Sequence, residues 1–303
     1  MKRRLGIAGA GAWGRALAHV AGLAGHDVSI WPRGHIPKDQ LCDAILLAVP
    51  AQVARAVLTD IKPTVRKGLP LIVAAKGIEQ STGLFMHEVV AEIIPEARTM
   101  VLSGPGFAVD VMRGLPTAVV LAAETLGEAG EWAEALTAPS FRIYNSDDVR
   151  GVEIGGALKN VLAIACGIAD GRGLGDSARA ALTTRGFAEL MRFGRKLGAR
   201  SETLVGLSGL GDLLLTCSSM QSRNYAFGLA IGRGRTVAEA FAQSTGVVEG
   251  AFTAKVAFEL ALRHGVSMPI VTAVHAIIDR EANPDAEIAK LLARPVGREM
   301  ETV

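Results

Sequence analysis

The 303-residue sequence has only three cysteines, Cys42, Cys166 and Cys217, and no CxxC pair. An odd number of widely spaced thiols argues against a disulfide framework and gives no zinc-binding spacing, so no metal site is expected. An excess of one charge is also missing, since 32 basic and 30 acidic residues leave a formal net charge of +2. With only 5% aromatic residues, this balance argues against a nucleic-acid-binding protein. A reducing, cytoplasmic location is expected.

Long uninterrupted hydrophobic runs are missing as well, although the mean hydropathy is +0.32. The best candidate, residues 44–58, is interrupted by Pro50, Gln52 and Arg55, and it falls short of the ~18 apolar residues that a membrane-spanning helix needs. The basic N-terminus is similar to a signal peptide, but the glycine-rich segment that follows suits a strand and a turn better. No membrane insertion is expected.

Glycine is abundant, with 35 residues and no collagen-like period, which indicates tight turns and close backbone contacts. Residues 1–148 alternate short apolar segments with helix-like segments, the pattern of a mainly parallel sheet covered on both faces. Helix-like segments without comparable strand signals fill residues 149–303. We therefore predict an α/β N-terminal domain, 1–148, and an all-α C-terminal domain, 149–303. The strands are predicted at residues 4–9, 27–31, 44–49, 70–74, 99–103, 117–123 and 141–144.

A glycine-rich segment, GAGAWG at residues 9–14, follows the first predicted strand and opens a helix-like segment. In such a GxGxxG turn the first glycine makes the turn, the second admits a pyrophosphate and the third lets helix and strand pack. The helix N-terminus offers N–H groups to the anion. The pattern predicts a Rossmann-like dinucleotide-binding domain with these residues at the cofactor: Gly9, Gly11, Ala12, Trp13 and Gly14.

The end of the second predicted strand lacks the acidic residue that holds the NAD ribose in many such domains. Trp31, Pro32 and Arg33 stand there instead. Arg33 can pair with a 2′-phosphate, which makes NADP at least as suitable as NAD, or it can be a surface arginine that follows a strand. Both interpretations stay open from the residues alone.

Several segments, in one order along the chain, resemble the NAD(P)-dependent glycerol-3-phosphate dehydrogenases of the bacterial biosynthetic type. The longest is VEIGGALKNVLAIACGIADG at residues 152–171. The others are GAGAWG at 9–14, AKG at 75–77, SGPGFA at 103–108, LTTRG at 182–186, GLSGLGDLLLTC at 206–217, SRN at 222–224 and VVEG at 247–250.

Two positions depart from the family pattern. The segment from Arg33 to Asp43, which precedes the AVP turn at residues 48–50, is shorter than in family members and leaves the adenine side of the cofactor site undefined. Gly106 replaces a hydroxyl residue in the GP(S/T)FA segment, so only backbone N–H groups could contact the substrate there.

The resemblance implies an oxidoreductase that interconverts dihydroxyacetone phosphate and sn-glycerol 3-phosphate with NAD(P)H, for phospholipid synthesis. It implies Lys159 as proton donor and acceptor, Asp212 as the carboxylate that orients it, and Lys76 as a second cation near cofactor and substrate. Such a lysine needs a lowered pKa, which desolvation and a neighbouring cation supply. The alternative for Lys159 is a helix lysine whose charged end reaches the surface, although the helix around it is apolar. Asp212 can instead be a helix N-cap, a role that is compatible with the family one.

Ser222, Arg223 and Asn224 offer a hydroxyl, a guanidinium and an amide at the start of a predicted helix, a combination that suits a phosphate. The family places the substrate phosphate there; a capped helix start with one surface arginine is the simpler alternative.

A tight turn with Gly104 and Gly106 follows a predicted strand, where α/β sheets bind ligands, although turn punctuation explains these glycines equally well. The resemblance places Gly104 and Gly106 at the substrate. It also places these residues at the cofactor: Lys76, Ala108, Arg223, Val247 and Glu249.

Two other functions are compatible with the sequence. One is another dehydrogenase with a Rossmann half and a helical half, of the β-hydroxyacid or ketopantoate-reductase kind. The other is a catalytically silent dinucleotide sensor. The SRN segment favours a phosphate substrate, and the presence of Lys159 and Asp212 favours an enzyme. A small phosphate substrate and a homodimer are expected.

Overall fold

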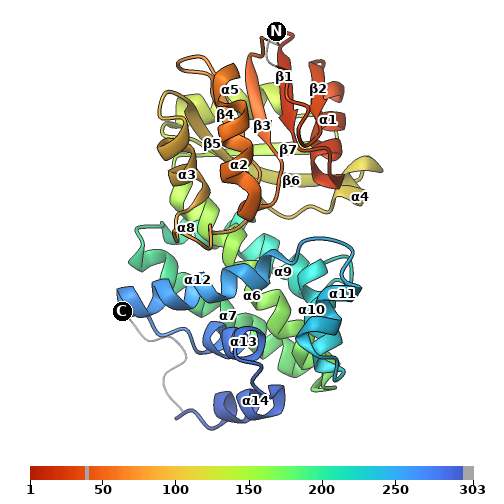
Figure 1. Ribbon diagram of the computed structural model, residues 1–303, viewed down its shortest axis with the longest axis vertical. Coiled ribbons are helices and arrows are strands. Elements are labelled where there is room, and N and C mark those ends of the chain that lie inside the picture. The colour runs from red at the N-terminus through yellow and green to blue at the C-terminus, as the bar shows by residue number, and fades with distance from the viewer. Residues whose placement is uncertain (38–40, 296–303) are drawn as a thin grey trace. The chain divides into compact units, whose positions relative to one another are not determined.

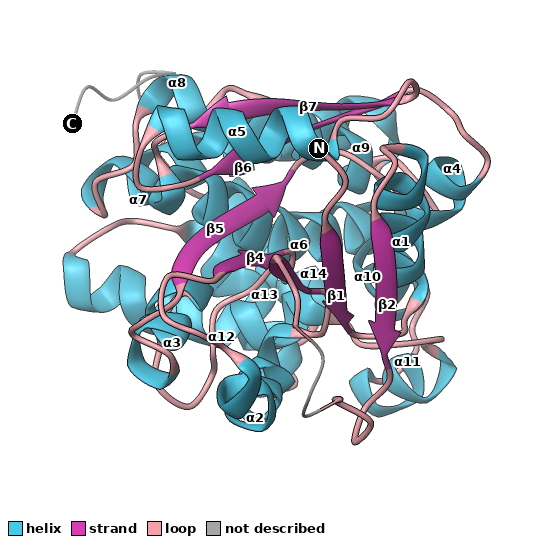
Figure 2. Cartoon of the chain, turned by 90° about the horizontal axis from the view of Figure 1, so that it is seen from above, coloured by secondary structure: helices cyan, strands magenta, loops and turns pink. Residues whose placement is uncertain are grey.

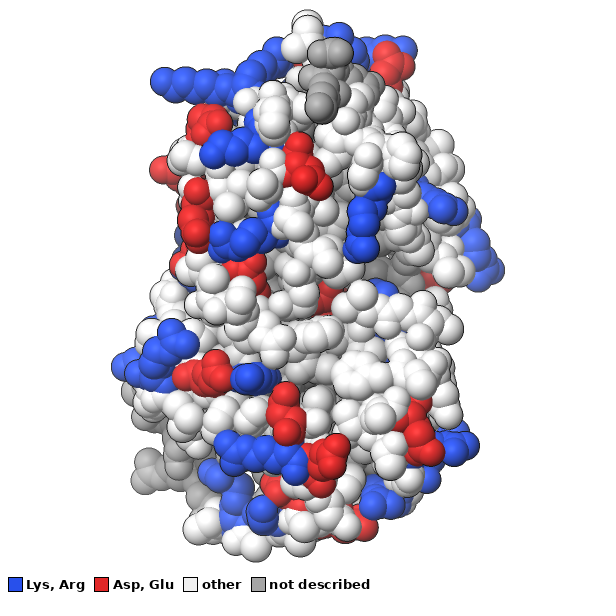
Figure 3. Space-filling view, viewed as in Figure 1, with Lys and Arg blue, Asp and Glu red and all other residues white. Residues whose placement is uncertain are grey.

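The computed structural model describes residues 1–37 and 41–295. The chain divides into two compact units, one from Met1 to Glu153 and one from Ile154 onward (Figure 1). The boundary expected between residues 148 and 149 is the point where helix α6 (Val149–Gly171) begins. On the face shown in Figure 3, basic and acidic side chains are interspersed.

Seven strands form one sheet in the first unit, in the order β2-β1-β3-β4-β5-β6-β7. All neighbouring strands are parallel except β5 and β6. Each strand lies within two residues of a predicted segment, so the predicted α/β class is confirmed. The strands are β1 (Arg4–Ala8), β2 (Asp27–Trp31), β3 (Ala44–Leu47), β4 (Pro70–Val73), β5 (Arg98–Ser103), β6 (Thr117–Ala122) and β7 (Phe141–Ser146).

Helices pack on both faces of this sheet (Figure 2). Because strand side chains alternate between faces, Leu5 and Leu46 join one apolar core, and Ala8 and Leu47 join the other. Helices α1 (Ala12–Leu23), α4 (Ala108–Met112) and α5 (Leu126–Leu136) complete the first core. Helices α2 (Ala51–Ile61) and α3 (Met86–Ile93) complete the second. The continuous apolar strands of the sequence are explained by this two-sided burial.

The second unit is built from helices within its described residues. Helix α6 is long and apolar enough to cross a membrane by length and composition, but its most apolar stretch is completely buried inside the structure, as in the core helix of a globular domain. The other helices are α7 (Gly175–Lys196), α8 (Ser201–Leu204), α9 (Asp212–Cys217), α10 (Arg223–Gly232), α11 (Val237–Gln243), α12 (Glu249–His264), α13 (Pro269–Asp279) and α14 (Pro284–Leu292).

Small residues let α10 lie directly against α6. A Cβ atom added to Gly167 would lie 2.1 Å from the carbonyl oxygen of Tyr225, and one added to Gly228 would lie 2.1 Å from that of Ile164. No side chain fits at such distances, so the two helix backbones are in contact. This packing fixes the start of α10 against the middle of α6.

A buried carboxylate caps helix α13. Glu189 of α7 accepts hydrogen bonds from the backbone N–H groups of Ile270, at 2.7 Å, and Val271, at 3.2 Å. Both belong to the first turn of α13, where N–H groups have no partner within the helix. Burial nevertheless dominates and raises the pKa of Glu189 to about 7, while the two N–H groups oppose the shift.

This raised pKa predicts that Glu189 weakens the fold as the pH rises. An unfolded glutamate ionises near pH 4.5 and the folded one near 7, so the native state binds the extra proton between these values. The contribution of Glu189 to the free energy of unfolding should fall by about 3 kcal/mol between pH 4 and pH 8. The glutamine of the Glu189→Gln variant does not titrate, so this loss is absent from it. As the pH rises from 4 to 8, the stability of the variant relative to the wild type should therefore increase. Urea unfolding at several pH values measures it, and a difference independent of pH would contradict the prediction.

Candidate active site

The glycine-rich turn of the first unit leads from β1 into α1. Gly11 is the N-cap of α1, so no side chain caps the N–H groups of the first turn, and that turn contains no acidic residue. A Cβ atom on Gly9 would lie 2.3 Å from the carbonyl oxygen of Ala48, and one on Gly14 would lie 1.9 Å from that of Gly9, whereas a Cβ atom on Gly11 would meet open space. The turn is therefore tightly packed on its inner side and open at Gly11, beside the N–H groups of the helix.

A cavity of about 200 Å³ adjoins this turn. It is lined by Gly9 and Gly11, by Trp31 and Arg33 at the end of β2, and by Asp60 near the end of α2. Arg33 is exposed on its rim. The first acid after Arg33 in the sequence, Asp39, lies outside the described residues. Among the described residues that line this cavity, Asp60 supplies a carboxylate.

Lys76 lies beside the turn at Gly104 in the first unit. Its Nζ donates a hydrogen bond to the carbonyl oxygen of Gly104 at 2.8 Å and lies 5.9 Å from the centre of the Trp13 ring. A Cβ atom on Gly106 would be 3.5 Å from this ring, so Trp13 occupies much of the room beside Gly106. Ala108 begins the short helix α4 that follows.

Lys159 and Asp212 form a buried ion pair in the second unit. Lys159 Nζ donates to Asp212 Oδ1 at 2.7 Å and to Thr216 Oγ1 at 3.0 Å. The lysine is 8% exposed and the aspartate 1%. The alternative of a lysine reaching into solvent is therefore wrong. Asp212 is also not an N-cap: Gly211 precedes α9 and makes no side-chain cap, and the Asp212 carboxylate is turned to Lys159.

The local fold explains how this pair arises. Leu207–Gly211 form a π-helical turn immediately before α9, a conformation that often occurs at functional sites. This turn packs on α6 at Gly155, where a Cβ atom would lie 2.6 Å from the carbonyl oxygen of Ser208. The close approach brings the first residue of α9, Asp212, to Lys159 one turn further along α6.

Ser222, Arg223 and Asn224 lie at the start of α10, as predicted. The Ser222 hydroxyl caps this helix by accepting from the N–H of Tyr225 at 3.2 Å. Asn224 is buried; its Nδ2 donates to Asn160 Oδ1 and its Oδ1 accepts from the N–H of Gly250, both at 2.9 Å. Asn224 therefore joins α6, α10 and the start of α12. Arg223 is the one charged residue of the three at 222–224.

Arg223 lies against the segment that leads into α12. A Cβ atom on Gly246 would be 2.7 Å from its Nη1. Val247 follows directly, and Glu249 is the first residue of α12. The structure thus brings Arg223 and this segment together. Gly104, Gly106, Lys76 and Ala108 lie in the first unit.

Two residues of the site were not singled out from the sequence. Thr216 stands four residues after Asp212, the spacing that places two side chains on one helix face, and its hydroxyl donates to the carbonyl oxygen of Asp212 at 2.6 Å. Asn160 follows Lys159 directly and holds Asn224. The i,i+4 spacing could have identified Thr216; the role of Asn160 depends on the packing of three helices.

A mostly parallel sheet with a glycine-rich turn before its first helix, and a buried lysine–aspartate pair in an all-helical unit, together are the features of a dinucleotide-dependent dehydrogenase. Comparison with known proteins narrows this class. The family model described as NAD-dependent glycerol-3-phosphate dehydrogenase C-terminus matches residues 148–289, and the corresponding N-terminus model matches residues 38–129.

Individual relatives agree with these models. The NAD(P)+ glycerol-3-phosphate dehydrogenase of Azorhizobium caulinodans is 51% identical, over 96% of this chain and 97% of the relative. That of Parvibaculum lavamentivorans is 46% identical over 98% of each chain. The crystal structure of glycerol-3-phosphate dehydrogenase from Coxiella burnetii is 37% identical with a TM-score of 0.90, over 97% of this chain and 99% of that one. The chain belongs to the NAD-dependent glycerol-3-phosphate dehydrogenase family.

The contacts of Thr216 predict its effect on stability. Thr216→Val keeps the shape of the side chain but leaves an N–H of buried Lys159 without this acceptor, which should lower the free energy of unfolding by about 1–3 kcal/mol. Thr216→Ser, which keeps the hydroxyl, should lose much less. Urea unfolding of the wild type and both variants measures these free energies. Equal stability of Thr216→Val and the wild type would show that the hydroxyl does not stabilise the folded state.

Proposed function

We propose that this chain interconverts dihydroxyacetone phosphate and sn-glycerol 3-phosphate with NADP(H) or NAD(H). The observation that carries the proposal is the buried Lys159–Asp212 pair, 2.7 Å between Nζ and Oδ1, in a chain of this family. Burying two charges is unfavourable unless the geometry is good and further hydrogen bonds are made, and Thr216 supplies such a hydrogen bond to Lys159.

The first unit fits a dinucleotide. The open side of Gly11, the N–H groups of α1 and the absence of an acid in its first turn suit a pyrophosphate. The indole Nε1–H of Trp13 is buried without an acceptor among the described residues. Gly9, Gly11, Ala12, Trp13 and Gly14 would hold the cofactor, which supplies or accepts the hydride when bound. We assign Lys76, Ala108, Arg223, Val247 and Glu249 to the same cofactor from the family resemblance.

Lys159 carries the proton in this proposal. In the reducing direction its ammonium donates a proton from Nζ to the carbonyl oxygen of the substrate, and in the oxidising direction Nζ accepts the hydroxyl proton. Asp212 and Thr216 fix the direction in which Nζ points, because each holds one of its N–H bonds. Lys76, held at Gly104, supplies a second cation near the substrate.

Arg223 holds the substrate phosphate in this proposal. Its guanidinium can make two parallel hydrogen bonds to phosphate oxygens, and it stands in the first turn of the ten-residue helix α10, where N–H groups favour an anion. Ser222 and Asn224 keep this helix start in position through the contacts described above. Gly104 and Gly106 are assigned to the substrate through their backbone.

The wider setting follows from the same proposal. A small phosphate substrate, a homodimer and a cytoplasmic location fit such an enzyme, and its product would supply phospholipid synthesis. Ketopantoate reductases share the fold at 14–17% identity, a likeness that concerns the fold alone. The Lys159–Asp212 pair argues against a silent dinucleotide sensor.

A direct assay tests the proposal. NADPH and NADH oxidation should be rapid with dihydroxyacetone phosphate and absent with ketopantoate or 3-oxo acids. Lys159→Ala should lower turnover by about 10²–10⁴-fold, the range for loss of a general acid, with cofactor affinity nearly unchanged. Lys196→Ala, an exposed lysine at the end of α7, is the matched control and should keep full activity. Turnover retained by Lys159→Ala would remove this residue from the mechanism.

A second prediction concerns the phosphate. Arg223→Ala should raise the KM for dihydroxyacetone phosphate by the equivalent of about 1.5–3 kcal/mol, the strength of a hydrogen bond to a charged group. Arg233→Ala, at the other end of α10 and exposed, should not. Separate titrations of substrate and cofactor distinguish the two contacts of Arg223. An unchanged substrate KM would place the phosphate elsewhere.

A third prediction concerns cofactor choice. NADPH should be used at least as well as NADH, because exposed Arg33 can attract a 2′-phosphate. Arg33→Ala should weaken NADPH selectively, by about 1–3 kcal/mol. Asp60, on the same cavity, would repel that phosphate, so Asp60→Ala should shift preference further towards NADPH. Values of kcat/KM for both cofactors provide the test. A strong NADH preference of the wild type, or equal losses for both cofactors in Arg33→Ala, would contradict it.

A further inference from the structure

A second, larger cavity lies within the helical unit. It has a volume of about 570 Å³ and is formed by α6, α7, α13 and α14 together with Arg294 and Pro295. None of Lys159, Asp212 or Arg223 lines it, so the proposed reaction leaves it unexplained. Its size is within the range of small-molecule binding sites.

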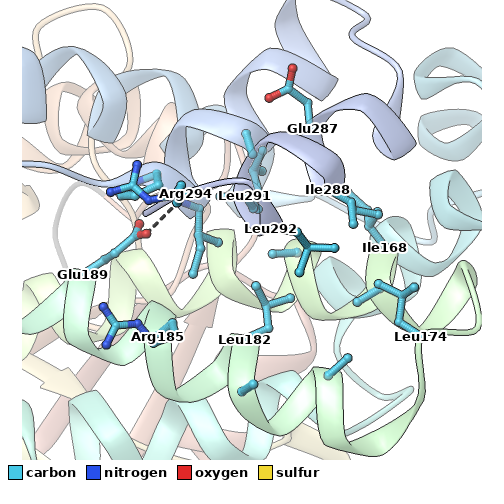
Figure 4. A pocket seen from close by; sticks show the side chains of 18 of the residues that line it. Ile168, Leu174, Leu182, Arg185, Glu189, Glu287, Ile288, Leu291, Leu292 and Arg294 are labelled. Carbon is cyan, nitrogen blue, oxygen red and sulfur yellow. Dashed lines mark hydrogen bonds between the residues drawn. The ribbon is translucent and has the colours of Figure 1, made fainter. Parts of the chain in front are cut away.

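The two ends of this cavity differ in character (Figure 4). Arg185, Glu189 and Arg294 lie at one end, where the described chain approaches its last residues. From there to the other end the labelled side chains on the cavity are aliphatic apart from Glu287, and they are Leu182, Leu291, Leu292, Ile288, Ile168 and Leu174. The cavity is therefore polar at one end and mainly apolar along the rest of its length.

The apolar part reaches solvent. Leu292 is 81% exposed and Leu174 is 45% exposed, although both line the cavity. Their exposure leaves aliphatic surface in contact with water beside a hollow that is itself lined by aliphatic groups. Covering such a surface with an apolar ligand removes it from water and is therefore favourable.

The charges at the polar end favour an anion. Arg185, Arg192 and Arg294 line the cavity, and the guanidinium of Arg192 donates to the carbonyl oxygen of Ser267. Two carboxylates also line it: Glu189 accepts two backbone N–H groups, and Glu287 is held by Lys290 Nζ at 2.6 Å. The three arginines outnumber the two carboxylates, and guanidinium groups bind carboxylates and phosphates with two parallel hydrogen bonds.

We propose that this cavity binds an anionic amphiphile, an unbranched acyl chain that ends in a carboxylate or a phosphate. The acyl chain lies along Leu182, Leu291 and Ile168, and the anion meets the arginine end. This ligand matches both halves of the cavity, and it is distinct from the small phosphate substrate of the proposed reaction.

Calorimetric titration of the full chain tests the proposal, with three ten-carbon probes kept below micelle formation. Decanoate represents a fatty acid, decanoyl glycerol phosphate a monoacyl phospholipid, and decanol the same chain without charge. At least one anionic probe should bind, and decanol should bind at least tenfold more weakly. The anionic probe that binds more tightly identifies the source of the ligand.

Variants locate the binding. Leu182→Trp fills the middle of the cavity and Arg185→Glu reverses a charge at its polar end; each should weaken the anionic probe at least tenfold. Arg195→Glu, on the same helix but outside the lining, should bind as the wild type does. Thermal unfolding and the dehydrogenase assay show whether each variant is folded, and Arg185→Glu provides the test if Leu182→Trp is not.

Several results would overturn the proposal. They are no binding of either anion, equal binding of decanol, and affinity unchanged in both cavity variants. A fourth such result concerns the molecular mass of the protein in solution. If the wild type is a dimer that Leu182→Trp dissociates, a second copy of this chain covers the cavity and the amphiphile is not its ligand.

Discussion

The burial of one ammonium and one carboxylate is the constraint on which the helical unit depends. Neither charge of Lys159 and Asp212 is favourable away from water, so each must find the other and additional hydrogen bonds. That requirement explains why the backbone before α9 takes a π-helical turn and why α6 carries a glycine where this turn approaches. It also explains the hydroxyl of Thr216 as the second partner of Nζ. The polar contacts of this pair thus act together with the backbone contacts at the glycines of α6 to position the neighbouring helices.

Much of the fold could be predicted because burial leaves a simple pattern in the sequence. Central strands of a sheet covered on both faces are buried on both sides, and residues 44–47 and 70–73 are accordingly apolar at every position. Helix α14 leaves a weak pattern in the sequence for the opposite reason. Within it only Glu287 is buried, so its sequence shows little apolar periodicity. The π-helical turn at residues 207–211 escaped prediction because glycines there are equally typical of a loop.

The candidate site could be predicted in part. Residues whose chemistry is unusual for their surroundings, such as a lysine in an apolar helix, stand out in the sequence. Asn160 and Asp60 do not, since an asparagine beside a lysine and an acid at a helix end are both ordinary. They matter only through residues that the fold brings near them: Asn160 accepts a hydrogen bond from Asn224, and Asp60 lines the same cavity as Arg33. Such long-range proximity leaves no local signal.

The position of β2 at the edge of the sheet has a consequence for contacts with other chains. Strand β2 stands at one end of the strand order, and no strand among the described residues pairs with its outer side. Ile30 is 39% exposed there. An unpaired edge of this kind can template a strand from another chain and so promote aggregation. Two features restrain it: β2 is only five residues long, and Pro32, which follows it, has no N–H group to extend a ladder. The exposed edge of the sheet is thus short, and it is followed by a residue that cannot donate a backbone hydrogen bond.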